Sequence, residues 1–385
     1  MPHSNLCSGD LVEVLSKEEI LATLDSDGQF EGLPFMAEML QYCGKRFRVY
    51  KRAHKTCDFV TNTGSRWVPG TVHLEGSRCD GSAHGGCQAK CLLYWKEAWL
   101  RRISSENDGG QIPPKEQEKA PTASALDRNA FSEERLAMAA RVSRKDEKEE
   151  TFACQATLLP AFTQPLSPWD IRQYVEDYTS GNEKSLRKMI PGFIYRAYDN
   201  LINLGIGWGP LLRGIYDAVQ KLWGGLPYPA RGGEIPAGGK TPTETLNLQP
   251  GEFVRVKDFR AILETLDTAS KNRGMTFSAE MVPYCGRVFR VLSRVERLID
   301  EKCGKMLNLK NGCIILEGVI CNAQYNSRML FCPRATYPYW REIWLERAEK
   351  PASAAQLAGP GNSSSKEPMA QFETARCASL SSLNS

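Results

Sequence analysis

Residues 9–25 read GDLVEVLSKEEILATLD, and residues 251–267 read GEFVRVKDFRAILETLD. The two stretches correspond at a constant offset of 242 positions. The matched pairs farther along the chain are Glu38-Met39 with Glu280-Met281, Tyr42-Cys43-Gly44 with Tyr284-Cys285-Gly286, Cys79 with Cys321 and, after a three-residue insertion, Cys87 with Cys332. We therefore expect one module to occur twice, over residues 9–103 and 251–348.

Local patterns within the repeated stretch indicate its secondary structure. Val12 and Val14 recur with a period of two, which is typical of a half-buried strand. Ser16 stands three residues before Glu19, the spacing of a capping box, so a short helix is expected to begin there and to end near Asp25. Residues 35–42 predict a helical turn, because the copy carries Pro283, which excludes a long regular helix.

Further strands are expected within residues 45–55 and around residues 72–76, with equivalents in the second copy. The Trp95/Trp99 and Trp340/Trp344 pairs, each four residues apart, predict core anchors with both rings on one side of a helical turn. Short strands separated by turns in so few residues predict an α+β protein with two small bent β-barrels. The opening Gly-Asp-x-Val-x-Val resembles the first strand of SH3-like barrels.

The rest of the chain differs in composition from the two copies. Apolar residues at helical spacing within 166–225 predict a helical insert of three helices, broken at Gly181 and near Gly205–Pro210, that joins the copies. The expected connecting segments are a flexible linker at 104–165, a Gly/Pro-rich linker at 226–250 and a disordered tail at 349–385.

The composition and the N-terminal residues indicate a compartment for the protein and a use for its cysteines. The chain has 385 residues, 13 cysteines and a net charge of +4, which is too weak to indicate nucleic-acid binding by itself. The first nine residues lack a basic segment followed by an apolar run, so we expect no secretory signal and a cytoplasmic protein. No apolar run suggests a transmembrane helix. In a reducing compartment, cysteines serve more often as thiols or metal ligands than as disulfides.

Cysteine density in the first copy predicts a zinc site. Tetrahedral zinc needs four thiolate or imidazole donors, and closely spaced glycines would let the backbone turn around an ion. The expected ligands are Cys57, Cys79, Cys87 and Cys91, with His54, His84 and Cys43 as alternates. The second copy lacks part of this set, so it either has no metal or uses Cys303, Cys321 and Cys332. Free structural thiols are the competing interpretation.

A basic strand offers the clearest binding surface. Cations and one aromatic side chain alternate along it, a pattern that suits contacts with a phosphate backbone and stacking on a base. The residues are Arg46, Arg48, Tyr50, Arg52 and Lys55. Alternatively, the strand presents a solvated face that nearby acids neutralise. We expect a protein partner or a single-stranded nucleic acid, and the sequence does not indicate an oligomeric state.

Catalytic motifs give no support for an enzyme. HExxH, GxSxG, Walker A and the deaminase pattern are absent from the sequence. The first hypothesis is therefore a binding or scaffold protein made of two β-modules, with structural zinc in the first. The alternative is a metal-dependent enzyme or biosynthetic-pathway accessory protein, with a cysteine-ligated zinc near Glu75 or His54.

Overall fold

The structure, a computed structural model, describes residues 5–61, 63–103, 132–142, 150–204, 207–326 and 328–350. The chain divides into two compact units. Unit 1 comprises Met1–Lys184 and Leu298–Leu307, and unit 2 comprises Ser185–Arg297 and Asn308–Ser385. The linker prediction for residues 104–131 and 143–149, and the tail prediction from residue 351 onward, lie outside the described residues.

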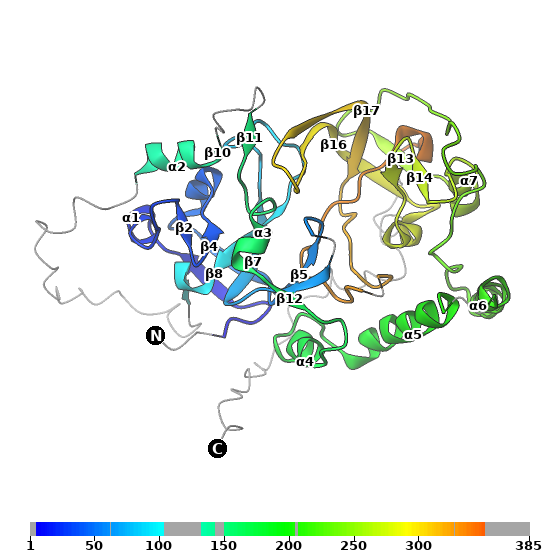
Figure 1. Cartoon of the computed structure of the whole chain (residues 1–385), viewed down its shortest axis with the longest axis horizontal. Helices are drawn as coiled ribbons and strands as arrows, with labels where there is room; N and C mark the ends of the chain where they lie inside the picture. Colours follow the sequence, from blue (N-terminus) through cyan, green and yellow to red (C-terminus); the bar gives the residue numbers. More distant parts are fainter. Residues whose placement is uncertain are drawn as a thin grey trace, which may run out of the picture. The chain divides into compact units, whose positions relative to one another are not determined.

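Unit 1 is built on a curled antiparallel sheet in the order β8-β7-β4-β1-β9 (Figure 1). Val12 and Val14 are buried while their neighbours are half-exposed, so the predicted opening strand is confirmed. Register shifts in the β4–β7 and β7–β8 pairs interrupt the ladder, as bulges do where a sheet bends. The strands are β1 (Leu11–Val14), β4 (Arg46–Arg52), β7 (Thr71–Arg78), β8 (Leu92–Lys96) and β9 (Leu100–Arg102).

Short elements close the first module. Helix α1 (Lys17–Leu21) begins with the predicted capping box, in which Ser16 Oγ accepts from the Glu19 N–H and the Glu19 carboxylate accepts from the Ser16 N–H. A hairpin of β2 (Gln29–Phe30) and β3 (Leu33–Pro34) follows. The expected turn before Gly44 is the 3₁₀ helix η1 (Ala37–Tyr42).

Two tryptophans anchor the core of unit 1, as predicted. Trp95 and Trp99 are both 0% exposed, and Phe35 packs edge-on against each ring. The prediction that they share a helical turn is wrong. Strand β8 continues to Lys96, so Trp95 lies in a strand and Trp99 ends the 3₁₀ helix η2 (Glu97–Trp99).

Part of the expected linker belongs to this unit. Leu136, Leu159 and Phe162 are buried in the core of the first module, and Phe152 is buried in a separate apolar group with Cys87 and Ile299. The prediction of a flexible linker is therefore corrected for the described residues 132–142 and 150–165. The elements are α2 (Glu133–Ala139), β10 (Arg141–Val142), β11 (Thr151–Phe152), α3 (Leu159–Phe162) and β12 (Gln164–Leu166). Strand β12 is the edge of a three-stranded sheet in the order β12-β6-β5, whose other strands are β5 (Lys55–Asp58) and β6 (Gly64–Trp67).

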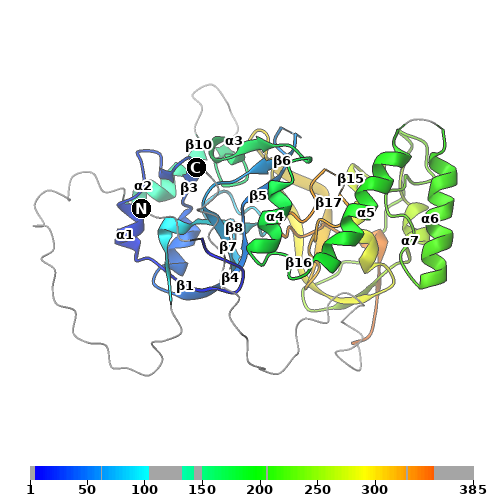
Figure 2. The ribbon, with the colours of Figure 1, turned by 90° about the horizontal axis from the view of Figure 1, so that it is seen from below.

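The three predicted helices are present. Helix α4 (Arg172–Thr179) belongs to unit 1, and helices α5 (Leu186–Ile202) and α6 (Gly209–Trp223) belong to unit 2, where they lie side by side (Figure 2). Ser185 caps α5 by accepting from the Arg187 N–H, and Gly224 ends α6 in the left-handed conformation that glycine adopts without strain. No helix among the described residues is both long and apolar enough to cross a bilayer.

In unit 2, strand β13 pairs with β16 and β18 as β1 pairs with β4 and β9 in unit 1. The sheet of unit 2 has the order β17-β16-β13-β18, with Val254 opposite Phe289, as Val12 is opposite Phe47. Trp344 Nε1 donates to Thr265 Oγ1 over 3.0 Å, as Trp99 Nε1 does to Thr23 Oγ1. The elements are β13 (Phe253–Val256), α7 (Phe259–Leu263), β14 (Lys271–Asn272), β15 (Met275–Thr276), η4 (Ala279–Tyr284), β16 (Val288–Ile299), β17 (Met306–Leu316), η5 (Glu342–Trp344) and β18 (Leu345–Arg347).

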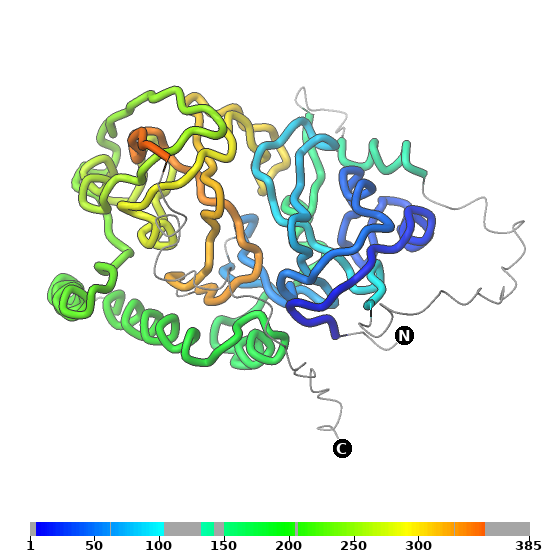
Figure 3. The backbone as a smooth tube through the Cα atoms, turned by 180° about the vertical axis from the view of Figure 1, so that it is seen from behind, coloured from blue at the N-terminus to red at the C-terminus, as the bar shows by residue number. Residues whose placement is uncertain are grey.

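Residues 226–250 run from α6 to β13, as the backbone tube in Figure 3 follows. No helix or strand is assigned in this segment, which agrees with its glycine and proline content. It is nevertheless packed on unit 2, because Tyr228 and Leu248 are buried and the Ile235 N–H donates to the Leu266 carbonyl. The segment is thus packed against unit 2 although it has no regular secondary structure.

Candidate metal centre

Glu38 is the first member of a buried polar cluster in unit 1. The 3₁₀ helix η1 turns its side chain inward between apolar neighbours such as Met39, and the carboxylate is 0% exposed. A carboxylate removed from water is costly unless it is paired or coordinates a metal. The surroundings of Glu38 therefore decide what this site can do.

A tight loop brings two further donors to Glu38. The loop begins at Cys79, after β7, and the His84 N–H donates to the Gly81 carbonyl over 3.1 Å, which folds the loop back on itself. A Cβ at Gly81 would lie 2.0 Å from the Cys87 carbonyl oxygen, and one at Gly85 would lie 2.6 Å from the Phe152 ring. Both glycines also have positive φ, so this loop shape requires glycine there.

The three side chains meet at short distances. Cys79 Sγ lies 3.3 Å from Glu38 Oε1 and 3.4 Å from His84 Nε2, and His84 Nδ1 lies 3.3 Å from Glu38 Oε1. One donor atom from each residue falls within 4.8 Å of the others, and all three residues are buried. Glu38 Oε2 and His84 Nδ1 have no hydrogen-bond partner among the described residues. Thiolate, imidazole and carboxylate are all ligands of zinc.

Burial controls the protonation of the cluster. Burial raises the pKa of Glu38. The pKa of the Cys79 thiol is also raised, first by burial and then by electrostatic repulsion from Glu38 and Cys91. Burial also lowers the pKa of His84 to about 4, so the imidazole is neutral at neutral pH and offers a lone pair. A bound cation would favour the ionised thiolate and carboxylate, because it supplies the positive charge that the pocket lacks.

The structure gathers only part of the predicted ligand set. Cys79 and the alternate His84 belong to the cluster, whereas Cys57, Cys87, Cys91, Cys43 and His54 do not. Cys87 packs with Phe152 and Ile299 in an apolar group, where burial raises its thiol pKa. His54 Nε2 lies 3.1 Å from the Gln173 carbonyl and 3.3 Å from Asp177, beside α4. Glu38 is the member that the sequence did not single out as a ligand.

The ligands considered for the second copy form no such cluster among the described residues. Cys303 is exposed at the tip of the β16–β17 hairpin, and that tip belongs to unit 1. Cys321 and Cys332 belong to unit 2. The three predicted cysteines are thus divided between the two units.

The basic strand is largely neutralised in the structure. Arg52 binds Glu97 at 2.5 Å and Glu176 at 2.8 Å, and Lys55 is 1% exposed with its Nζ 2.5 Å from Asp177. The prediction of Lys55 as a surface contact is corrected, because the carboxylate of α4 holds it inside. Arg46 and Arg48 remain exposed and Tyr50 is half-buried.

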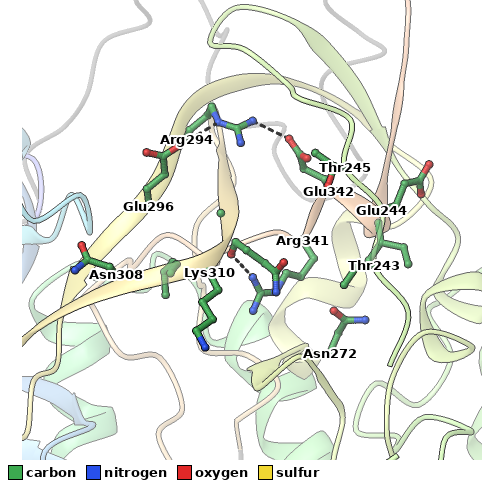
Figure 4. Close-up of a pocket in the computed structure, with 14 residues that line it drawn as sticks. Thr243, Glu244, Thr245, Asn272, Arg294, Glu296, Asn308, Lys310, Arg341 and Glu342 are labelled. Carbon is green, nitrogen blue, oxygen red and sulfur yellow. Dashed lines mark hydrogen bonds and ion pairs between the residues drawn. The ribbon is translucent and has the colours of Figure 1, made fainter. Parts of the chain in front are cut away.

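Unit 2 contains a polar cavity of about 460 Å³ (Figure 4). Its guanidinium groups already bind internal partners, since Arg294 donates to Glu342 over 2.8 Å and Arg341 donates to the Arg273 carbonyl over 3.1 Å. An anionic ligand would have to displace these contacts. The cavity therefore supports a function less directly than the buried cluster does.

Comparison with protein-family models, with curated proteins and with solved structures found no match to this chain.

Proposed function

We propose that this chain is a zinc-binding scaffold protein in which one β-module is duplicated and only the first copy holds the ion. The observation that carries the proposal is the buried Glu38–Cys79–His84 cluster, whose three donor atoms lie within 4.8 Å of one another. A soft thiolate with an imidazole and a carboxylate favours zinc over magnesium or calcium, which prefer oxygen donors alone.

The shared registers support the duplication. Each module pairs its first strand with the same partners, and Phe35 and Phe277 lie 5.2 Å, between ring centroids, from Trp99 and Trp344, respectively. Such detailed agreement at a constant sequence offset is what two copies of one ancestral module would show. The bent sheets also suit the SH3-like interpretation of the modules.

The ion would stabilise unit 1. Glu38 comes from η1, and Cys79 and His84 come from the loop that follows β7, so coordination would join two segments that are separate in sequence. Binding to the folded state alone stabilises a protein by about 2.7 kcal/mol when the free ion is at 100 times its Kd. In this scaffold role, the two modules would present surfaces to a protein or nucleic-acid partner, with Arg46 and Arg48 as exposed cations.

One observation favours an enzyme as the second candidate. The cluster offers three protein ligands, and three ligands leave a fourth zinc position for water or substrate, as in catalytic sites. Glu75 and His54 are not part of the cluster, so a catalytic role would depend on Glu38 instead.

Elemental analysis of the purified full-length protein tests the proposal. We expect about one zinc per chain in the wild type and in Cys321→Ser, and little in Cys79→Ser or His84→Ala. Cys321→Ser is a matched control, because it removes the equivalent thiol of the second copy. Cobalt substitution should give thiolate charge-transfer absorption that Cys79→Ser abolishes.

Failure to take up zinc or cobalt, or equal loss of metal in the control, would contradict the proposal. Unfolding of unit 1 after chelation would indicate a structural ion. A folded, metal-free protein that has lost a hydrolytic activity would favour the enzyme.

A further inference from the structure

Helix α5 presents an apolar stripe to water. Its inner face is formed by Met189, Gly192, Tyr195 and Ile202, which are buried in unit 2. The opposite face should then be polar. Instead, it carries exposed apolar side chains at helical spacing, namely Leu186 (58% exposed), Ile190 (51%), Ile194 (60%) and Leu201 (45%).

Helix α6 continues this pattern. None of its residues is buried, although the helix is strongly amphipathic. Its exposed apolar side chains recur every three or four residues from one end to the other. They are Leu211, Ile215, Val219 and Leu222, with Trp208 at the start and Trp223 at the end. A face of this kind on two adjacent helices is larger than the scattered apolar residues of an ordinary surface.

The charges around the stripes are mainly positive. Residues 185–224 contain five basic and two acidic side chains. Asp199 is buried and Asp217 is half-buried, and both are paired with other groups of unit 2. Asp199 accepts from the Tyr228 hydroxyl over 2.5 Å, and Asp217 binds Arg231 and accepts from the Tyr228 N–H. Among the described residues of this span, the charged side chains classed as exposed are Arg187, Lys188 and Lys221.

We propose that α5 and α6 form a docking surface for an anionic phospholipid bilayer. The helices would lie in the plane of the membrane, with the apolar stripes among the acyl chains and Trp208 and Trp223 at the headgroup level. The exposed lysines and Arg187 would contact the lipid phosphates. This inference is independent of the metal centre.

The charge pattern favours a bilayer over a second copy of the chain. Protein interfaces exclude lysine from their centres, and a pair of identical cationic faces would repel each other. An anionic bilayer instead attracts those cations while it covers the apolar stripes. Asp217 does not offset the positive charge of α6, because it is paired with Arg231.

Co-sedimentation of the full-length protein with vesicles tests the proposal. We expect binding to vesicles of equimolar phosphatidylcholine and phosphatidylglycerol, weakening with salt, and much weaker binding to phosphatidylcholine alone. Ile190→Glu combined with Leu211→Glu should reduce partitioning by about tenfold or more. Met138→Glu is the matched control, since Met138 is an exposed apolar residue (70%) on α2 and should leave binding unchanged.

Quenching by brominated lipid gives a second readout. Trp208 and Trp223 should be quenched in anionic vesicles, and Trp208→Phe with Trp223→Phe should remove most of the signal while circular dichroism stays unchanged. Absence of binding to anionic vesicles, equal binding to neutral ones, or a dimer that the Ile190→Glu/Leu211→Glu variant dissociates would overturn the proposal.

Discussion

Glu38 in unit 1 and Glu280 in unit 2 correspond at the sequence offset of 242 positions but have different surroundings. Glu280 accepts the Tyr325 N–H over 2.5 Å, and further backbone N–H groups of residues 322–324 favour its charge. At the equivalent place, Glu38 faces the Cys79 thiol and the His84 imidazole. One buried carboxylate is satisfied by the backbone and the other is left to side chains that bind metals.

The difference comes from one loop. Residues 80–86 read DGSAHGG, and the corresponding segment after Cys321 begins NAQYNSR, with no histidine. A single loop can therefore turn a capped carboxylate into a candidate metal ligand while the surrounding sheet keeps its pairings.

The largest expected effect tests the buried ion pair between Lys55 and Asp177 in unit 1. Asp177→Asn leaves the Lys55 ammonium, which is 1% exposed, without its carboxylate. Breaking a buried ion pair in this way costs about 3–5 kcal/mol. The equivalent residue in the second module is the exposed Arg297, and Arg297→Ala should cost about 1 kcal/mol or less. Urea unfolding of both variants measures the two losses in free energy of unfolding, and equal losses would contradict the prediction.

The second effect concerns pH. Burial raises the pKa of Glu280 to about 7, above its value in the unfolded chain, so the folded state binds the proton more tightly. Unit 2 should therefore lose about 2–3 kcal/mol as pH rises from 4.5 through 7. Glu280→Gln should flatten this dependence and leave the zinc content unchanged.

Urea midpoints at pH 5 and pH 8 check this prediction. Glu317→Gln, at an exposed carboxylate, is the matched control and should keep the wild-type slope. A pH slope that Glu280→Gln does not alter would show that Glu280 is not the titrating group.

A smaller and equal effect is expected where the modules agree. Thr23→Val and Thr265→Val each remove the hydroxyl that accepts from a buried tryptophan Nε1, at 3.0 Å in both units. Leaving a buried donor unpaired costs about 1–3 kcal/mol. Hydrogen exchange measured separately for each unit should show that the two variants lose similar amounts of stability. Clearly unequal losses would argue against equivalent cores.

Much of the fold could be predicted because its signals are local. The alternation of Val12 and Val14, the Ser16–Glu19 capping box and the helical periodicity of residues 186–202 each lie within a few turns of chain. The predicted linker is too long, because its charges and prolines indicate a flexible segment. Phe152 and Phe162 are buried against partners in other segments, which local composition does not show.

The candidate site was harder to predict because its donors come from segments about 40 residues apart. Cysteine density pointed to Cys79, but the same density pointed to Cys87, which Phe152 draws into an apolar cluster. Glu38 had one sequence signal that could have identified it. It is a charged residue among apolar neighbours, followed directly by Met39, and the same Glu-Met pair recurs as Glu280 and Met281.

An anomalous difference map at the zinc absorption edge, from crystals of the full-length protein, tests the central claim most directly. We predict one peak at about 2.0–2.3 Å from donor atoms of Glu38, Cys79 and His84, and no peak beside Glu280. A peak at other cysteines, or no peak in crystals soaked with zinc, would contradict the assignment of the metal centre.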